Sequence, residues 1–242
     1  MLNELVIGSR GSKLALTQTQ WIADRIKLHN PGIETRVEII KTKGDKILDT
    51  PLAKIGDKGL FVKEIEAALI DSRIDLAVHS MKDLPSEMTE GLIIGAIPPR
   101  VDPSDVLLSY KGKLSELPAG SKVGSSSLRR RAQLLHIRPD LQFEDLRGNL
   151  DTRINKLQAG EYDAIVVAYA GLHRLKWNRD KAGEGLSEQP VMEKLPFDIC
   201  LPAVGQGALA VQIRANDHRI LDIASKLDDY LTRAAVDAER SL

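Results

Sequence analysis

The sequence has a single cysteine, few aromatic residues and no net charge. Cys200 is the only cysteine among 242 residues, which excludes an internal disulfide and fits a reducing compartment. Phe, Trp and Tyr make up 4% of the chain, so the core must consist mainly of Leu, Ile, Val and Ala. Lys plus Arg total 34, as do Asp plus Glu, and a general attraction to nucleic acid or an anionic membrane is therefore not expected.

Several common motifs are missing as well. No apolar run approaches the roughly 20 residues that span a bilayer, and residues 1–12 lack the basic and apolar regions of a signal peptide, so we expect a cytoplasmic protein. Lys54 and Lys58 lie in AKIGDKG, which lacks the G-x-x-x-x-G-K-[ST] arrangement and favours a mobile lid over a nucleotide loop. Cys200 has no CxxC or histidine spacing around it, so no metal site is expected.

The sequence does contain one order of elements twice. Strands are predicted in the first half at 4–9, 35–45 and 75–78, with helices at 13–28 and 62–73 between them. The second half repeats this order with strands at 121–127, 141–149 and 162–172 and helices at 128–137 and 150–161. Such alternation predicts an α/β fold with βαβ units and mostly parallel sheets.

Two such halves predict two lobes. Residues 98–103, PPRVDP, are interpreted as the first crossing between them, and 201–214, LPAVGQGALAVQIR, as a return strand with Gly205 and Gly207 as flexible points. We therefore expect a hinged pair of lobes with a cleft, and ligands bound at the carboxyl ends of the strands.

Polar residues gather at those strand ends. Ser125, Ser126 and Ser127 open a predicted helix, where free N–H groups favour an anion. Arg129 and Arg130 follow in its first turn, against the helix dipole, and arginine binds carboxylates and phosphates in a bidentate manner. Helix-capping serines followed by solvated arginines are an equally good interpretation of this segment alone.

Further arginines favour the anion site. Arg10, Arg147 and Arg153 lie at other strand-to-helix turns. Five arginines in such turns of a chain without excess positive charge indicate a site for a small molecule with several carboxylates or phosphates.

The segment DLAVHSMKDLP, 75–85, ends a predicted strand in a polar cluster. His79 is a candidate general base, although a lone histidine at a strand end is more often structural. Asp83 is the carboxylate of the strand-end cluster. Among basic neighbours it should stay ionised, which suits it to stabilise a cation or to move a proton.

These motifs together closely resemble the porphobilinogen deaminase (hydroxymethylbilane synthase) family. The resemblance runs from about residue 4 to the final AERSL and rests on HSMKDLP, KGLFVKEIE, VGSSSLRR, LRGNLDTR, YDAIVVAYAGLHRL and LPAVGQGA. It implies a transferase that joins four porphobilinogen molecules, with loss of ammonia, to 1-hydroxymethylbilane in haem biosynthesis. It also implies a dipyrromethane cofactor bound through a cysteine, and two lobes resembling type II periplasmic binding proteins followed by a smaller α+β domain.

The resemblance assigns roles to individual residues. Asp83 would be catalytic, Phe61 would belong to the lid with Lys54 and Lys58, and Gln206 would lie at the hinge near the cofactor. The expected substrate- or cofactor-binding residues are Arg10, Ser12, Lys54, Lys58, Ser80, Lys82, Ser125, Ser126, Ser127, Arg129, Arg130, Arg147, Arg153 and Gln206. The resemblance further implies a monomer whose partner is porphobilinogen, without nucleic acid, membrane or metal.

The sequence departs from the family at its end. We expect domain 1 at 1–98 plus 203–224, domain 2 at 99–202, and an incomplete start of domain 3 at 225–242. The family's attachment cysteine lies in a Gly-Gly-Cys loop beyond this point, so none is expected in this chain, and Cys200 is not expected to take that role. Turnover by the 242-residue chain therefore stays open, and residues 176–198 receive no role.

Two other interpretations are kept. The first is a two-lobed binding protein for a polyanionic small molecule that performs no chemistry. The second takes LRRRAQLLHIR, 128–138, as a nucleic-acid-binding helix, which the neutral charge disfavours.

Overall fold

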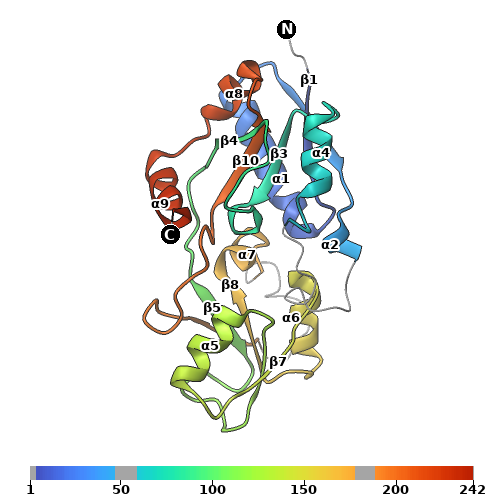
Figure 1. Ribbon diagram of the computed structural model, residues 1–242. Helices are drawn as coiled ribbons and strands as arrows, with labels where there is room; N and C mark the ends of the chain where they lie inside the picture. Colours follow the sequence, from blue (N-terminus) through green and yellow to red (C-terminus); the bar gives the residue numbers. More distant parts are fainter. Residues whose placement is uncertain (1–3, 47–58, 178–188, 242) are drawn as a thin grey trace. The chain divides into compact units, whose positions relative to one another are not determined.

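The computed structural model describes residues 4–46, 59–177 and 189–241. The chain forms two compact units (Figure 1). The described part of unit 1 comprises residues 4–46, 59–101 and 204–241, and that of unit 2 comprises 102–177 and 189–203. None of the helices in these ranges combines the length and apolar character needed to cross a membrane.

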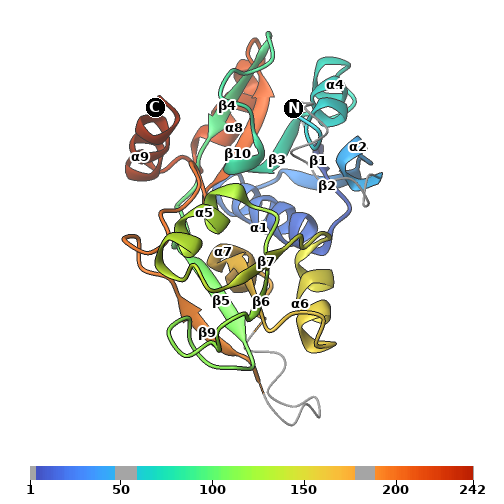
Figure 2. The same cartoon turned by 60° about the horizontal axis from the view of Figure 1, so that its bottom comes forward.

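Unit 1 is built on a five-stranded mixed sheet. The strand order is β2 (Glu34–Ile39), β1 (Glu4–Ser9), β3 (Leu76–Ser80), β10 (Leu209–Arg214) and β4 (Leu92–Ala96). Its helical segments are α1 (Lys13–His29), α2 (Lys43–Lys46), α4 (Lys63–Ile70), the short 3₁₀ helix η1 (Met81–Asp83), α8 (His218–Ser225) and α9 (Tyr230–Arg240). Helices α1 and α8 pack apolar side chains on one face of this sheet and α4 covers the other (Figure 2).

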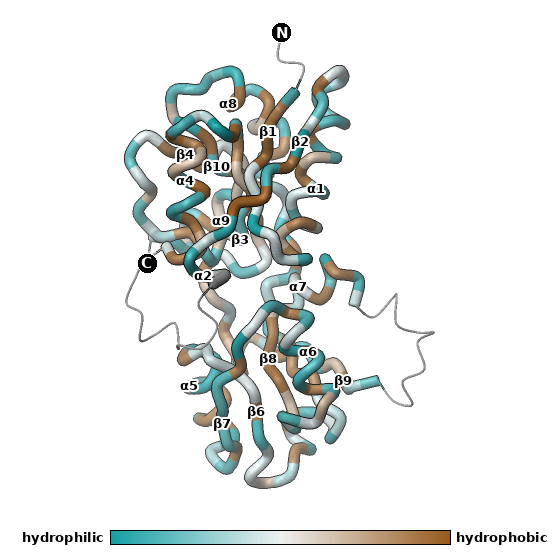
Figure 3. Tube along the Cα trace, turned by 90° about the vertical axis from the view of Figure 1, so that its right-hand side faces the viewer, coloured by the Kyte–Doolittle hydropathy of each residue, from teal (hydrophilic) through white to brown (hydrophobic). Residues whose placement is uncertain are grey.

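Unit 2 contains a second five-stranded sheet. Its order is β7 (Gln142–Glu144), β6 (Lys122–Gly124), β8 (Ala164–Ala168), β5 (Asp105–Ser109) and β9 (Val191–Lys194). Its helices are α5 (Leu128–Ile137), α6 (Leu150–Gln158) and α7 (Tyr169–Arg174). The apolar character of β8, like that of β1 in unit 1, is visible along the chain trace (Figure 3). Each fully buried Leu, Ile or Val stabilises its unit by about 1.5–3 kcal/mol.

The prediction of mostly parallel sheets is half right. In the described residues β1 pairs in parallel with β2 and β3, and β6 with β7 and β8. Strand β10 runs antiparallel to β3 and β4, and β5 runs antiparallel to β8 and β9. These strands enter their sheets after the chain has crossed between the units, so no short βα connection dictates their direction.

Two predicted strands are shorter than expected. The strand predicted at 35–45 ends at Ile39, and α2 begins at Lys43. The strand predicted at 162–172 ends at Ala168 and continues directly into α7. Its apolar residues continue into the helix, where Ala170 and Leu172 are buried, so hydrophobicity alone did not reveal the change.

Strand register determines which residues meet at one edge of each sheet. In unit 1, Ile7 pairs in parallel with Leu76, so the ends of β1 and β3 lie together. Leu209 pairs with Ser80 in the antiparallel β10, so the loop before β10 reaches that same edge. In unit 2, the pairing of Asp105 with Ala168 likewise brings the start of β5 to the ends of β6 and β8.

Candidate functional site

The serines at the edge of the unit 1 sheet have partners within that unit. The Ser9 hydroxyl is buried and accepts a hydrogen bond from Thr19 Oγ1 at 2.8 Å. Ser12 is the N-cap of α1, and its hydroxyl accepts from the Ala15 N–H at 3.2 Å. Ser80 Oγ lies 3.3 Å from Gln18 Nε2. Ser12 therefore has a capping role in addition to the predicted ligand contact.

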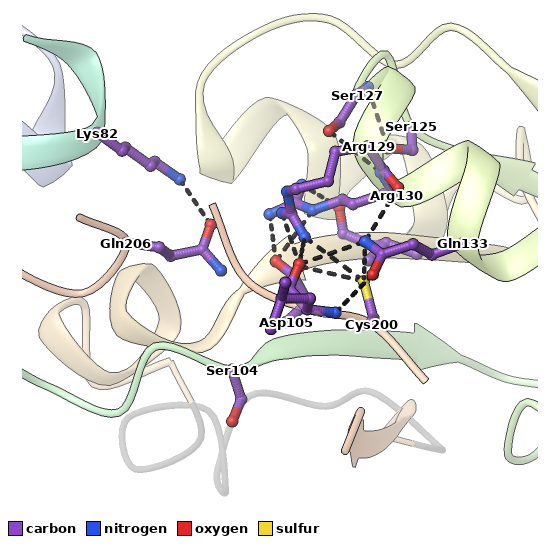
Figure 4. Close-up of polar contacts among 12 residues, drawn as sticks. Lys82, Ser104, Asp105, Ser125, Ser127, Arg129, Arg130, Gln133, Cys200 and Gln206 are labelled. Carbon is purple, nitrogen blue, oxygen red and sulfur yellow. Dashed lines mark hydrogen bonds and ion pairs between the residues drawn. The ribbon is translucent and has the colours of Figure 1, made fainter. Parts of the chain in front are cut away.

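The turn after β3 presents Asp83 to solvent. Asp83 and Lys82 are exposed in η1, whereas Met81 is completely buried beneath them. Lys82 Nζ donates to Gln206 Oε1 at 3.3 Å (Figure 4). The structure therefore brings together three residues that the sequence predicted for the site: Lys82, Asp83 and Gln206.

The loop that carries Gln206 is held at several points. Gly205 has φ of 67°, and a Cβ there would lie 2.5 Å from Met81 Cγ, so both conformation and space require glycine. The Gly205 N–H donates to Glu239 Oε2 at 2.7 Å, and Arg100 Nε donates to the Gln206 carbonyl at 2.8 Å. These contacts fix the backbone position from which the Gln206 side chain extends.

Arg10 follows β1 in the same unit. Its guanidinium carbon lies 4.1 Å from the centroid of the Phe61 ring, a cation–π contact. Arg10 was predicted for the ligand contacts and Phe61 for the lid, and the structure places these two side chains in contact. Lys54 and Lys58, predicted for the lid and the ligand contacts, lie outside the described residues.

His79 belongs to a buried network. Its Nε2 donates to Gln212 Oε1 at 3.0 Å, with Gln212 Nε2 in turn donating to Glu66 Oε1 at 2.8 Å. Thr89 Oγ1 donates to the other Glu66 oxygen at 2.7 Å. Burial lowers the pKa of His79 to about 4, and the nearby charge of Arg10 acts in the same direction, against the Gln212 hydrogen bond. These contacts support the structural interpretation of His79.

The three serines of unit 2 directly precede α5. Ser127 is its N-cap and accepts from the Arg130 N–H at 3.4 Å. Ser126 Oγ donates to the Leu146 carbonyl at 3.1 Å, and Ser125 Oγ accepts from the Ser127 N–H at 3.3 Å. The capping interpretation of these serines is thus correct for Ser127, and it is compatible with an anion at the remaining N–H groups.

Arg129 and Arg130 converge on one buried carboxylate. Arg130 Nη2 and Nε donate to Asp105 Oδ1 at 2.6 and 3.0 Å, and Arg129 Nη2 lies 2.7 Å from Asp105 Oδ2 (Figure 4). Asp105 was not among the residues predicted from the sequence. The available signal was an acidic residue directly before the apolar run VLL at the start of a strand.

Two more arginines lie beyond β7. Arg153 Nε donates to the Gly148 carbonyl at 2.8 Å, which ties α6 to the RGN turn. Gly148 has φ of 109°, a conformation that favours glycine. Arg147 is half-buried in the same turn. Unit 2 therefore gathers its predicted serines and arginines around the carboxyl ends of β6 and β7.

Cys200 is a buried free thiol. Burial and the neighbouring Asp105 carboxylate together raise its pKa to about 11, against the opposing effect of Arg129 and Arg130. A thiol with this pKa is a poor nucleophile at neutral pH. Across the described ranges, no group of three or more His, Cys, Asp or Glu side chains is arranged to hold a metal ion.

The comparisons with known proteins agree with these motifs. Residues 5–222 match the family described as "Porphobilinogen deaminase, dipyromethane cofactor binding domain". A porphobilinogen deaminase of Brevibacillus brevis is 54% identical over 236 residues, a match that covers 97% of this chain and 73% of that protein. The chain belongs to the porphobilinogen deaminase family. A Maridesulfovibrio salexigens porphobilinogen deaminase is 55% identical over 240 residues, which cover 99% of this chain and 75% of the relative.

Membership in the porphobilinogen deaminase family confirms the resemblance and the enzyme class predicted from the motifs. The chain spans about three quarters of the length of these relatives. Among solved structures, an ancestral cationic amino acid solute-binding protein matches 99% of this chain and 94% of its own at a TM-score of 0.54 and 13% identity. That match concerns the fold alone, and it confirms the predicted likeness to periplasmic-type binding proteins.

Proposed function

We propose that this protein is a transferase that polymerises porphobilinogen, with release of ammonia, to 1-hydroxymethylbilane in tetrapyrrole biosynthesis. The observation that carries this proposal is the match to porphobilinogen deaminases over 97% or more of the chain. The exposed Asp83 beside Lys82, and arginines at the strand ends of each unit, provide the chemistry that this reaction needs.

The substrate explains why cations are needed. Each porphobilinogen ring carries an acetate and a propionate, and growing chains accumulate carboxylates. In unit 1, Arg10, Ser12, Ser80, Lys82 and Gln206 bind substrate or cofactor. In unit 2, the binding residues are Ser125, Ser126, Ser127, Arg129, Arg130, Arg147 and Arg153. Guanidinium groups suit this role because two parallel N–H bonds match a carboxylate.

Asp83 is the catalytic residue of the proposal. Loss of ammonia leaves a cationic methylene-pyrrole, which the α-carbon of the next ring attacks. The Asp83 carboxylate, exposed in η1 directly after β3, stabilises this positive charge and accepts hydrogen bonds from pyrrole N–H groups. Preorganised charge of this kind is often the largest catalytic contribution.

The family description names a dipyrromethane-type cofactor, and the donor set of this chain fits such a group. Serine hydroxyls, guanidinium groups and helix N–H groups at the start of α5 all suit a carboxylate-bearing bipyrrole. When bound, the cofactor supplies the end from which the chain grows. Cys200 is not its attachment point in this proposal, since its thiol is buried and its pKa is raised.

The central test is the substitution Asp83→Asn. We expect the variant to fold like the parent and to lose at least about 100-fold in turnover, the size of effect that removal of one preorganised electrostatic group has elsewhere. Ammonia release from porphobilinogen and formation of the bilane are measured together. Asp71→Asn, at the exposed end of α4, is the matched control and should keep full activity. Near-normal turnover of the Asp83 variant would remove this residue from the mechanism.

The non-catalytic alternative makes an opposite prediction. A binding protein for a polyanionic molecule would bind porphobilinogen without releasing ammonia from it. Ammonia release by the parent chain therefore excludes it.

We also propose that the protein is a cytoplasmic monomer with porphobilinogen as its partner. The free Cys200 thiol fits a reducing compartment. Light scattering during size-exclusion chromatography tests the monomer, and a mass of two chains would contradict it.

A further inference from the structure

Asp105 has an unusual position in unit 2. Its carboxylate is completely buried at the start of β5, and it contacts three side chains that each lie far from Asp105 in the sequence. One oxygen accepts from Arg130 Nε and Nη2, and the other accepts from Arg129 Nη2 and from Cys200 Sγ at 3.4 Å. The carboxylate thus lies between two guanidinium groups and a thiol (Figure 4).

The backbone around Asp105 is held in place. Asp105 pairs with Ala168 across the sheet, and its carbonyl accepts from the Leu195 N–H at 2.9 Å. Arg130 is held from a second side, because its Nη1 donates to the Val166 carbonyl at 2.9 Å. The sheet therefore fixes the carboxylate, and the carboxylate fixes the orientation of the guanidinium groups.

The two arginines differ in their exposure. The side chain of Arg129 is 26% exposed, whereas that of Arg130 is 8% exposed. Arg129 is also tied to the Leu201 carbonyl through Nη1. Solvent, and therefore a ligand carboxylate, reaches Arg129 more easily, while Arg130 supplies positive charge from beneath it.

We propose that Asp105 is a positioning residue that holds the guanidinium groups of Arg129 and Arg130 in the orientation that binds pyrrole carboxylates at the start of α5. This inference rests on the proposed function, because it identifies the group behind the ligand-binding arginines. Asp105 itself does not touch substrate.

The substitution Asp105→Asn should affect the two arginines differently. The Asn carbonyl oxygen can still accept both bonds from Arg130, but its amide then faces Arg129 Nη2, donor against donor. The substitution therefore releases Arg129 while Arg130 keeps its partner. Asp163→Asn is the matched control, because Asp163 is likewise a carboxylate with a cationic partner, a lysine, in unit 2. It also accepts from a backbone N–H, and it lies before β8, at the end of that strand opposite to the one that Asp105 faces.

Two measurements test the proposal. The first is porphobilinogen affinity by calorimetry, which should weaken about tenfold in Asp105→Asn, equivalent to about 1.4 kcal/mol, and stay unchanged in Asp163→Asn. The second follows the titration of Cys200 by carbon-13 NMR of labelled cysteine, since Asp105, Arg129 and Arg130 are the charges that face this thiol. Because the Asp105 charge raises the pKa of Cys200, its loss should lower the pKa of Cys200 in Asp105→Asn but not in Asp163→Asn. A merely structural defect would not produce this shift selectively.

Each outcome decides between the proposals. Unchanged or tighter porphobilinogen binding by Asp105→Asn would overturn the positioning role, because Asp105 would then be neutral or a competitor of the ligand. An unshifted Cys200 titration would overturn the geometry on which that role depends. Failure of the unsubstituted chain to bind porphobilinogen would overturn the proposed function and this inference with it.

Discussion

At the scale of single residues, the low pKa of His79 predicts that the stability of the protein depends on pH. Its folded value of about 4 lies below the ordinary 6.5 because the ring is buried. The unfolded chain therefore binds the extra proton more readily, so stability is fully present above pH 6.5 and falls as the pH drops towards 4. At about 1.4 kcal/mol per pKa unit, the full loss amounts to about 3.5 kcal/mol.

The substitution His79→Gln tests this linkage. It removes the titrating group and should flatten the dependence of the unfolding free energy on pH between 4 and 6.5, as measured by urea denaturation. His136→Gln, at an exposed position of α5, should keep the slope of the parent. An unchanged slope in His79→Gln would show that another group causes the acid sensitivity.

Residue patterns led to the predicted site residues, but they did not indicate Asp105, the carboxylate that pairs with Arg129 and Arg130. Arg129 and Arg130 were proposed as ligand-binding residues because both lie in the first turn of a predicted helix, which is a local property of the sequence. The one local signal for Asp105, an acidic residue before an apolar run, does not indicate which residues it contacts. Its contacts with those arginines and with Cys200 span 24 to 95 residues of sequence and arise from strand pairing that no local pattern encodes.

At the scale of secondary structure, the elements with local signals were predicted best. Helix α1 begins after the capping Ser12 and α5 after the capping Ser127, both as the sequence indicated. Strands β4, β5 and β9 were not predicted. Strand β10 was found as a return strand, but its antiparallel direction depends on where the chain re-enters the sheet, which is a property of the whole unit.

The cap of α5 permits a test that separates stability from binding. Ser127→Ala removes the hydroxyl that accepts the Arg130 N–H and should cost about 1 kcal/mol of unfolding free energy. Ser127→Asp keeps a good cap but adds a negative charge beside the ligand carboxylates, so it should retain stability and weaken porphobilinogen binding. Urea denaturation and calorimetry measure the two effects. If Ser127→Asp bound porphobilinogen as well as the parent, the start of α5 would not be a carboxylate site.

At the scale of the whole chain, three distant segments meet in unit 1. Arg100 comes from the first crossing, Gly205 from the return, and Glu239 from the last turn of α9. The Glu239 carboxylate accepts from Arg100 Nη1 and Nη2 at 2.5 and 3.0 Å and from the Gly205 N–H at 2.7 Å. Arg240 next to it donates to the carbonyls of the turn after Asp83. The start of a third domain at residue 225 stays a prediction, and the contacts of α9 lie within unit 1.

These contacts predict that α9 supports the site from a distance. Partial burial acts to raise the pKa of Glu239, but the bonds from Arg100 and Gly205 outweigh it and lower the pKa. The stability that this carboxylate provides is therefore present above its unfolded pKa and is lost as the pH falls. Glu239→Gln should cost about 1.5–3 kcal/mol of unfolding free energy, the range for hydrogen bonds to charged groups.

The same substitution should also affect catalysis, because it frees the loop that presents Gln206 to Lys82. We expect kcat/KM to fall several-fold, with most of the change in KM, since a loosened loop weakens binding before it alters the charge of Asp83. Asp237→Asn, on the exposed face of α9, controls for the loss of one carboxylate on this helix. If the Glu239→Gln variant had the same stability and KM as that control, the ion pair between Glu239 and Arg100 would not support the site.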